Sequence, residues 1–229
     1  MSDLFPIRLN KYLALHTGTS RRQADDLIAQ GKITINGTPA IIGARINEGD
    51  QVAIEGQLLS PDTSLVYIAL HKPVGYVCSR RRQGDSPTIY ELLPPQYHSL
   101  KPVGRLDRDS SGLILLTNDG DFAQQMTHPR YYKIKQYDVS LDKPLEPLHQ
   151  QMISDFGVTL EDGPSQLTLE RQTDDRLHWK VTMSEGRNRQ IRRTFAALGY
   201  TVTDLHRTHF GLYELANLGK GKYQVISRL

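Results

Sequence analysis

The stretch VGRLDRDSSGLILLTNDG, residues 103–120, sets charged residues directly before an uninterrupted apolar run. Residues 113–116 are short and wholly apolar, which predicts a buried strand, and Asn118-Asp119-Gly120 predicts a turn after it. The residues before the run are therefore expected to form a loop that leads into this strand. Loops held by rigid elements commonly carry catalytic groups. Asp107, with Arg105 and Arg108 beside it, is a candidate nucleophile or base, and a turn or ion-pair role is the alternative.

The sequence around this loop alternates between strand-like and helix-like segments. The expected strands share β-branched or alternating apolar residues and cover residues 65–73, 112–116, 133–141, 165–170 and 177–183. Two helices are expected near residues 145–155 and 188–198. This pattern predicts a mixed, mainly antiparallel α+β domain over residues 65–229.

Arginines are concentrated in MSEGRNRQIRRTFAALG, residues 183–199, at Arg187, Arg189, Arg192 and Arg193. Residues three or four apart share a helix face, so one guanidinium can hold a carboxylate while others hold phosphates. Ile191, Phe195 and Leu198 are spaced as a core-facing stripe. The next segment, VTDLHRTHFG, places Leu205 and Arg207 near an expected strand end.

The first fifty-six residues form a separate pattern. Residues 8–16 and 20–30 have helical apolar spacing, Ser20 and Gln23 form a capping box, and Gly31 can end the second helix. KITI, an Asn36-Gly37 turn and GDQVAI follow, which predicts a small antiparallel sheet. We therefore expect a two-helix domain over residues 1–56 and a linker over residues 57–64.

Basic residues of this first domain are clustered at Arg8, Lys11, Arg21, Arg22 and Lys32. They could bind phosphates or merely be solvated helix surface. A second basic run, at residues 80–82 beside Gly84, predicts an exposed loop.

Composition excludes several classes. The chain has 229 residues, 38% hydrophobic and 23% charged, with a net charge of +3 and only one cysteine, Cys78. A disulfide framework is excluded, no metal-ligand spacing occurs, and no apolar run reaches the roughly 20 residues that span a bilayer. The opening residues do not resemble a signal peptide. We expect a cytoplasmic protein that does not bind membranes, and the pI of about 8.9 allows a polyanionic partner.

The N-terminal segment, with its SRRQA and G-x-I-x-ING patterns, resembles the small S-four-like RNA-binding domain over residues 7–55. This resemblance implies that five residues contact RNA phosphates: Arg8, Lys11, Ser20, Arg21 and Arg22.

The rest of the chain resembles the RsuA/RluB family of pseudouridine synthases over residues 67–228. The motifs KPVGYV, VGRLDRDSSGLILLTNDG, KQYDV, EGRNRQIRR and VTDLHRTHFG carry this resemblance in that order. It implies site-specific isomerisation of uridine to pseudouridine in ribosomal RNA, without a metal or other cofactor. The arginine-rich EGRNRQIRR slightly favours a large-subunit target. We expect a monomer that acts on ribosomal RNA or a ribosomal assembly intermediate.

The resemblance also implies roles for individual residues. Asp107 is the catalytic carboxylate and Arg192 is the basic residue paired with it. Tyr137 stacks on the uracil and can take or relay the ring proton, and Leu205 packs against the uracil. Arg105 can occupy the place of an extruded base. Arg189 and Arg207 complete the expected substrate-binding set.

Three other interpretations stay open at this point. Asp107 and Asp109 could hold Mg²⁺ for phosphoryl transfer, or Asp107 and Glu185 could form a two-carboxylate hydrolase. Alternatively, the chain could be a noncatalytic RNA-binding or ribosome-assembly factor that uses its basic clusters alone. Each makes a different prediction for metal dependence, product mass and the effect of neutralising Asp107.

Overall fold

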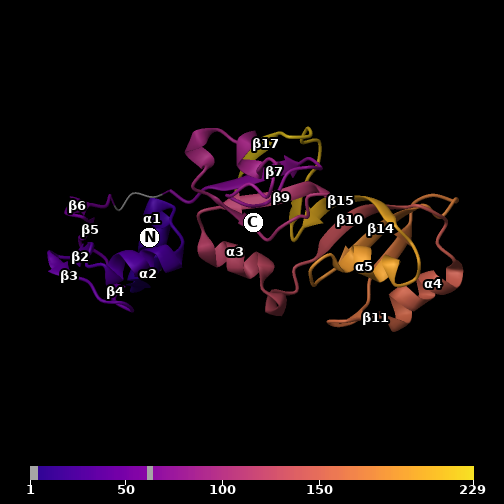
Figure 1. The fold of residues 1–229 in the computed structure, drawn as a ribbon, viewed down its shortest axis with the longest axis horizontal. Helices are drawn as coiled ribbons and strands as arrows, with labels where there is room; N and C mark the ends of the chain where they lie inside the picture. The colour runs from indigo at the N-terminus through magenta and orange to yellow at the C-terminus, as the bar shows by residue number, and fades with distance from the viewer. Residues whose placement is uncertain (1–4, 61–63) are drawn as a thin grey trace. The chain divides into compact units, whose positions relative to one another are not determined.

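A computed structural model describes residues 5–60 and 64–229, which form two compact units (Figure 1). The first contains the chain up to Val66 with the short segments Ser99–Lys101 and Asn118–Gly120, and the second contains the remainder. Both combine helices with mainly antiparallel sheet, as the sequence predicts. No helix in the described ranges is long and apolar enough to cross a membrane.

The N-terminal unit contains two helices, α1 (Leu9–Thr17) and α2 (Arg21–Ala29), beside small sheets. The predicted capping box is confirmed, because Ser20 Oγ accepts from Gln23 N and Gln23 Oε1 accepts from Ser20 N. Gly31 follows α2 with φ +70°, the left-handed conformation predicted for it. Its strands are β1 (Ile7–Arg8) with β4 (Arg45–Ile46), and β3 (Thr38–Pro39), β2 (Ile33–Ile35), β5 (Val52–Ile54) and β6 (Gln57–Leu58) in that order.

The structure corrects the expected linker over residues 57–64. Gln57–Leu58 is strand β6, paired with β5, because Glu55 and Gly56 both have positive φ and turn the chain back as a tight hairpin. Residues 61–63 of the expected linker lie outside the described residues.

The second unit is built on a sheet that has nine strands within the described residues. Its main order is β13 (Thr168–Arg171), β14 (His178–Met183), β10 (Lys135–Leu141), β15 (Val202–Phe210), β9 (Ser111–Thr117), β7 (Tyr67–Lys72) and β17 (Tyr223–Ile226). β16 (Tyr213–Glu214) pairs with β15, and β8 (Lys101–Val103) pairs with β9. Neighbours in the main order are antiparallel except for β15 and β9, which are parallel.

Three helices accompany this sheet: α3 (Gly120–Thr127), α4 (Pro147–Gln151) and α5 (Gln190–Ala196). A π-helical turn, Met152–Phe156, extends α4, and the hairpin β11 (Val158–Leu160) and β12 (Gly163–Ser165) follows it. The turn expected at residues 118–120 leads directly into α3, whose Phe122 and Met126 are buried at helical spacing. These two side chains join Leu113 and Leu115 of β9 in one apolar cluster.

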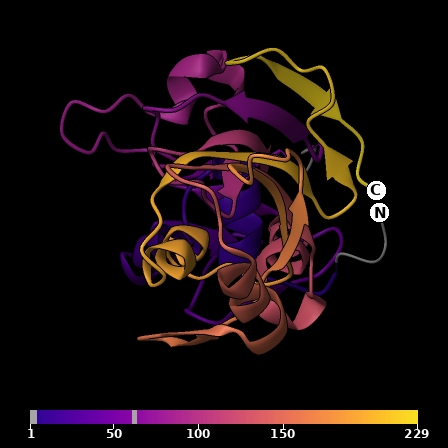
Figure 2. The same ribbon diagram turned by 90° about the vertical axis from the view of Figure 1, so that its right-hand side faces the viewer.

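β9 confirms the predicted buried strand, since all seven of its residues are buried. The expected strand end at Leu205 and Arg207 is wrong, because both lie in the middle of the long strand β15. The basic run at residues 80–82 lies in a loop after β7, and Figure 2 shows this loop extending away from the sheet.

Candidate active site

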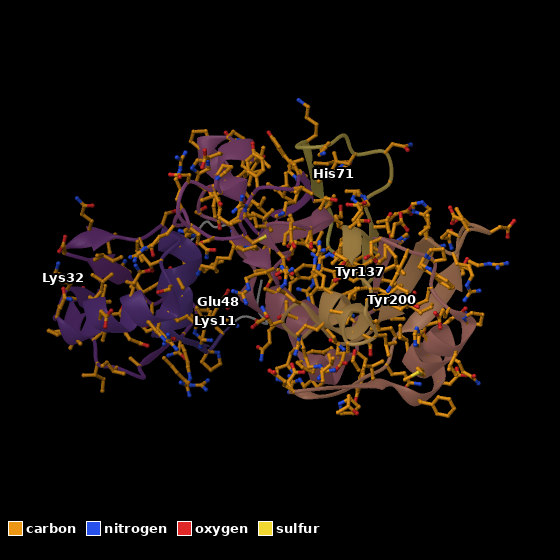
Figure 3. The ribbon with its side chains drawn as sticks, turned by 45° about the vertical axis from the view of Figure 1, so that its right-hand side comes forward. Lys11, Lys32, Glu48, His71, Tyr137 and Tyr200 are labelled. Carbon is orange, nitrogen blue, oxygen red and sulfur yellow. The ribbon has the colours of Figure 1, made fainter. Side chains whose placement is uncertain are left out.

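A cavity of about 310 Å³ lies where the loop before β9 meets the start of α5 and the strands β10 and β15. The sequence analysis named seven catalytic and substrate-binding residues. Six of them line it: Arg105, Asp107, Tyr137, Arg189, Leu205 and Arg207. Tyr137 is labelled in Figure 3. Arg192 is not among the lining residues.

A buried lysine that the sequence reasoning missed binds the backbone of the loop that carries Asp107. Lys72 ends β7 with no exposed surface, and its Nζ donates to the carbonyl oxygens of Pro73 (3.0 Å), Asp107 (2.9 Å) and Ser110 (2.6 Å). Burial lowers the pKa of Lys72 to about 8. A lysine at the end of the largely apolar strand segment YIALHK was the signal that could have identified it.

Gly112 permits the close approach between this loop and β15. Gly112 pairs with Arg207 across the parallel strands, and a Cβ placed on it would lie 2.2 Å from the Arg207 carbonyl oxygen. Its φ of +108° also favours glycine. Any larger residue would push the Asp107 loop away from the strand that carries Leu205 and Arg207.

The arginine facing Asp107 is Arg189, not Arg192. Arg189 Nη1 lies 3.7 Å from Asp107 Oδ2, and its two Nη atoms donate to the Asp109 carboxylate at 3.0 and 2.9 Å. Arg189 precedes α5 with φ +47°, a left-handed conformation that is costly for a non-glycine residue. Hydrogen bonds from Arg189 lower the pKa of the Asp109 carboxyl and raise the pKa of Arg189 itself.

Arg192 holds the same loop through its backbone, which corrects the pairing implied by the family resemblance. Its Nη2 donates to the Asp109 carbonyl oxygen and its Nη1 to the Val202 carbonyl oxygen, both at 2.7 Å. Its Nε lies 3.3 Å from Asp109 Oδ2. One helical turn separates Arg192 from Arg189. Both arginines therefore reach Asp109, and Arg189, which is nearer the start of α5, also lies within 4 Å of the Asp107 carboxylate.

The other two arginines of this segment bind the β11–β12 hairpin. Arg193 donates to both carboxylate oxygens of Asp162, at 3.0 and 2.7 Å, and Arg187 Nη1 donates to Asp162 Oδ1 at 2.8 Å. Behind them, Gln190 Nε2 and Thr194 Oγ1 both donate to the buried Ser165 Oγ. These two arginines are therefore engaged by a carboxylate rather than free for phosphates.

Tyr137, Leu205 and Arg207 lie on adjacent strands, where Tyr137 is opposite Arg207 and Val139 opposite Leu205. Arg207 is only 2% exposed; its Nε donates to the Leu113 carbonyl oxygen at 2.8 Å, and its guanidinium carbon lies 4.8 Å from the centre of the Phe210 ring. Its Nη2 is buried and finds no hydrogen-bond partner among the described residues. A buried donor of this kind is costly unless a ligand satisfies it.

Lys135, which lines the cavity, is a second lysine that the sequence reasoning missed. Its Nζ donates to the Glu185 carbonyl oxygen at 3.2 Å, and burial, followed by the charge of Arg207, lowers its pKa to about 8. It lies two residues before Tyr137 on β10, so the period of a strand was the available signal.

The RNA-binding residues predicted in the N-terminal unit lie on or beside α1 and α2. Arg8, Ser20, Arg21 and Arg22 are exposed, and Lys11, labelled in Figure 3, is partly buried. Ser20 Oγ accepts the capping bond from Gln23, and its hydroxyl hydrogen can still donate to a phosphate. Lys32 pairs with Glu55 at 2.9 Å.

Comparison with known proteins places this chain in a family. The RNA pseudouridylate synthase family matches residues 66–197, and the S4 domain matches residues 7–52. The ribosomal small subunit pseudouridine synthase A of Pasteurella multocida is 40% identical, with 96% of each chain covered. The ribosomal large subunit pseudouridine synthase B of Bacillus subtilis is 34% identical, with 93% of this chain and 89% of that protein covered.

Two further relatives extend this similarity. The dual-specificity RNA pseudouridine synthase RluF of Escherichia coli is 36% identical over 95% of this chain and 74% of its own length. A crystal structure of a pseudouridylate synthase matches with a TM-score of 0.69 and 36% identity, covering 96% of both chains. The chain therefore belongs to the RNA pseudouridylate synthase family, in the group that also carries an N-terminal S4 domain.

Proposed function

We propose that this protein isomerises a specific uridine of ribosomal RNA to pseudouridine, with Asp107 as the catalytic carboxylate. One observation carries the assignment of Asp107. It lines a cavity of about 310 Å³ together with Tyr137 and Leu205, and the Arg189 guanidinium lies 3.7 Å from its carboxylate. Single-ligand pockets begin at about this size, so the cavity suits one extruded nucleotide rather than a base pair.

The reaction rearranges bonds without adding or removing atoms from the RNA. The bond from uracil N1 to the sugar C1′ breaks, the ring turns, C5 bonds to C1′, and C5 loses its proton. The Asp107 carboxylate either attacks the sugar or ring, or removes a sugar proton to form a glycal. Both routes need an ionised carboxylate, and Arg189 is placed to stabilise its charge.

Tyr137 stacks on the uracil in this proposal and takes or relays the C5 proton, while Leu205 packs against the ring. Arg207 donates its unpaired Nη2 to an acceptor on the target nucleotide, which relieves a buried unsatisfied donor. Arg192 acts as a positioning residue, because it holds the Asp109 backbone rather than a reacting group.

Arg105 has a separate role in reaching the base. It is exposed and lines the cavity two residues before Asp107. When the uridine leaves its stack, the planar guanidinium fills the vacated space by stacking and hydrogen bonding.

The substrate proposal rests on the relatives and on the S4 domain. The curated relatives are named for the small subunit, for the large subunit and for dual specificity. The large-subunit target expected from the arginine-rich motif stays a prediction. Fewer arginines of this motif are open to RNA than the sequence suggests, since Arg187 and Arg193 are bound to Asp162. Arg8, Lys11, Ser20, Arg21 and Arg22 bind phosphates of the same RNA in this proposal. In this proposal the protein acts as a monomer on ribosomal RNA or on a ribosomal assembly intermediate.

The rival interpretations fit the site less well. The Asp109 carboxylate is already bound by Arg189 and Arg192, so a Mg²⁺ ion would have to displace two guanidiniums. Glu185 accepts hydrogen bonds from Gln190 and Arg187, which does not leave it free as a second catalytic carboxylate.

Carbodiimide mapping of pseudouridine tests the function directly. Both ribosomal RNAs are prepared from a strain lacking the gene and treated with the purified protein, with and without a chelator. We expect one or a few new pseudouridines that persist in chelator and are missing after treatment with Asp107→Asn. Pseudouridine formed equally by the variant would reject Asp107, and no new pseudouridine with the native protein would favour the noncatalytic RNA-binding factor.

A further inference from the structure

Apolar and aromatic side chains are exposed together at one margin of the cavity. Tyr131, Tyr132, Ile134 and Leu212, which we call the tyrosine rim, are 37%, 75%, 51% and 75% exposed. The first three follow α3, where a 3₁₀ turn, Pro129–Tyr131, leads into β10, and Leu212 lies in the turn between β15 and β16. An exposed apolar cluster of this kind commonly marks an interaction site.

Backbone contacts join the two segments of the rim and attach them to the cavity. The Gly211 N–H donates to the Ile134 carbonyl oxygen at 2.7 Å, which brings Leu212 beside Ile134. Pro129 and Lys135, the residues immediately before and after the segment 130–134, both line the cavity. The rim therefore lies next to the cavity that holds the target nucleotide in the proposed function.

Tyr132 has a strained backbone conformation, although packing of its exposed side chain does little to offset the strain. Its φ and ψ are +46° and +42°, the left-handed region that a bulky residue adopts only at a cost. A ring that is 75% exposed recovers little of this cost by burial. Strained residues cluster at ligand-binding sites, where the backbone geometry serves the ligand.

The two tyrosines differ in what they can still bind. Arg130 donates to the Tyr131 hydroxyl, and its guanidinium carbon lies 4.5 Å from the centre of the Tyr131 ring. Tyr132 makes no ring contact with any described residue. The face of the Tyr132 ring is thus the one open to a planar partner.

The charge around the rim selects the kind of partner. Residues 122–137 contain no aspartate or glutamate but include Arg130, Lys133 and Lys135. Exposed aromatic rings interleaved with cations are the recognition surface for single-stranded nucleic acid, in which bases stack on the rings and phosphates meet the cations.

We propose that the Tyr132 ring stacks a base that flanks the target uridine, while Arg130 and Lys133 bind the adjoining phosphates. This inference rests on the proposed function, because it takes the target to be in RNA. It extends that function by adding a base-stacking subsite outside the cavity, so that the RNA strand is held on both sides of the extruded nucleotide.

Fluorescence anisotropy of a short fluorescein-labelled oligouridylate, titrated with the full-length protein at several salt concentrations, tests the subsite. Tyr132→Ala should weaken binding about tenfold, since loss of one aromatic platform has this order of effect. It should leave the salt dependence unchanged, because no phosphate contact is lost. Tyr132→Phe, which keeps the ring, should bind within about twofold of the native protein.

Lys133→Gln and Phe156→Ala complete the design. Lys133→Gln should reduce the slope of log K against log salt by about 0.7, the value for one phosphate contact on a single strand. Phe156 is also 75% exposed but does not line the cavity, so Phe156→Ala should bind as the native protein does. Alanine is subject to the same left-handed cost as tyrosine, so Tyr132→Ala leaves the backbone strain in place.

Unchanged affinity in Tyr132→Ala, or an equal loss in Phe156→Ala, would overturn the inference. A Tyr132→Ala protein that binds RNA normally but loses self-association in size-exclusion chromatography would assign the rim to a protein partner instead. Failure of the proposed function is distinguishable, because it would appear as normal pseudouridine formation by Asp107→Asn, whatever the binding result.

Discussion

Three arginines on or beside α1 and α2 differ from four on or beside α5 in whether a carboxylate already binds them. Within the described ranges, Arg8, Arg21 and Arg22 have no ion-pair partner, whereas Arg187, Arg189, Arg192 and Arg193 each lie within 4 Å of a carboxylate oxygen. Both clusters look alike in the sequence. The difference shows that local arginine density does not measure RNA binding, because a guanidinium bound to a carboxylate must give up that partner before it can hold a phosphate.

Two aspartates divide the α5 arginines further. Asp109 draws Arg189 and Arg192 towards the Asp107 loop, and Asp162 draws Arg187 and Arg193 towards the β11–β12 hairpin. One arginine of each pair, Arg189 and Arg187, lines the cavity, whereas Arg192 and Arg193 do not. Under the proposed function the N-terminal unit supplies phosphate contacts, and the second unit supplies the chemistry together with the proposed base-stacking subsite.

The largest expected effect separates chemistry from affinity. Asp107→Asn should lower the rate of pseudouridine formation by at least about a thousandfold, because an amide has neither the charge nor the nucleophilicity of a carboxylate. Its affinity for ribosomal RNA should stay within a few fold. Single-turnover kinetics and filter binding measure the two quantities, and Asp138→Asn, an exposed aspartate beside Tyr137, is the matched control. Parallel loss of affinity would break the division between the units.

Neutralising the open cations should give the next largest effect. The triple variant Arg8→Gln, Arg21→Gln, Arg22→Gln should weaken RNA binding by roughly ten- to a hundredfold and reduce the salt slope by about 2 to 3, since three phosphate contacts are lost. Filter binding across a salt series measures the slope. An unchanged slope would mean that these residues are solvated surface charge.

Arg105→Ala tests how the uridine is reached. The substitution should slow modification of structured RNA about tenfold more than that of an unstructured oligonucleotide with the same target, because only the structured RNA has a vacated stack to fill. Single-turnover rates at saturating protein provide the comparison. Equal slowing of the reaction with both substrates would mean that Arg105 holds Asp107 or a phosphate instead of replacing the extruded base.

Lys72 is a third kind of cation, buried and bonded to carbonyl oxygens rather than to a carboxylate. Its pKa is about 8 in the fold and 10.5 in the unfolded chain, so the unfolded state binds more protons between these values. Burying Lys72 therefore lowers the free energy of unfolding most below pH 8. As the pH rises from 8 to 9.5, the free energy of unfolding increases by about 1 to 2 kcal/mol.

Lys72→Met should remove this part of the pH dependence. Urea unfolding of both proteins at several pH values measures it, with Lys32→Met as the control for a partly exposed lysine. Parallel curves for native protein and Lys72→Met would show that the three carbonyl oxygens keep Lys72 charged throughout this range.

The smallest expected effect concerns the hairpin arginines. Arg193→Gln should lower the thermal unfolding midpoint by at most a few degrees, because partly exposed ion pairs contribute little. It should not change the salt slope of RNA binding, in contrast to Arg22→Gln, which should reduce the slope by about 1. A smaller slope in Arg193→Gln would show that RNA displaces Asp162, and the comparison between the two clusters would fail.

Sequence reasoning was most successful where structure depends on neighbouring residues. The Ser20–Gln23 capping box, the left-handed Gly31 and the buried strand at residues 113–116 are all confirmed. Helix α3 was missed because it begins within an expected turn and is short. Its two buried apolar residues, Phe122 and Met126, are too few to reveal a helical period. The expected end of a strand at Leu205 was wrong because β15 lacks a regular alternation: Thr203 and Asp204 are both exposed, and the charged Arg207 is buried.

The sequence by itself determined the α+β class, the two kinds of domain and their order, and six of the seven site residues it named line the cavity. Tertiary structure alone decided which partner each of those residues has. Asp162 is 31 residues from Arg193, Asp109 is 80 from Arg189, and Lys72 is 35 from the Asp107 carbonyl that it binds. A helix cap or an apolar alternation is set within a few residues of chain, whereas these pairings depend on strand register and on the approach that Gly112 permits to Arg207, and neither is encoded by local spacing.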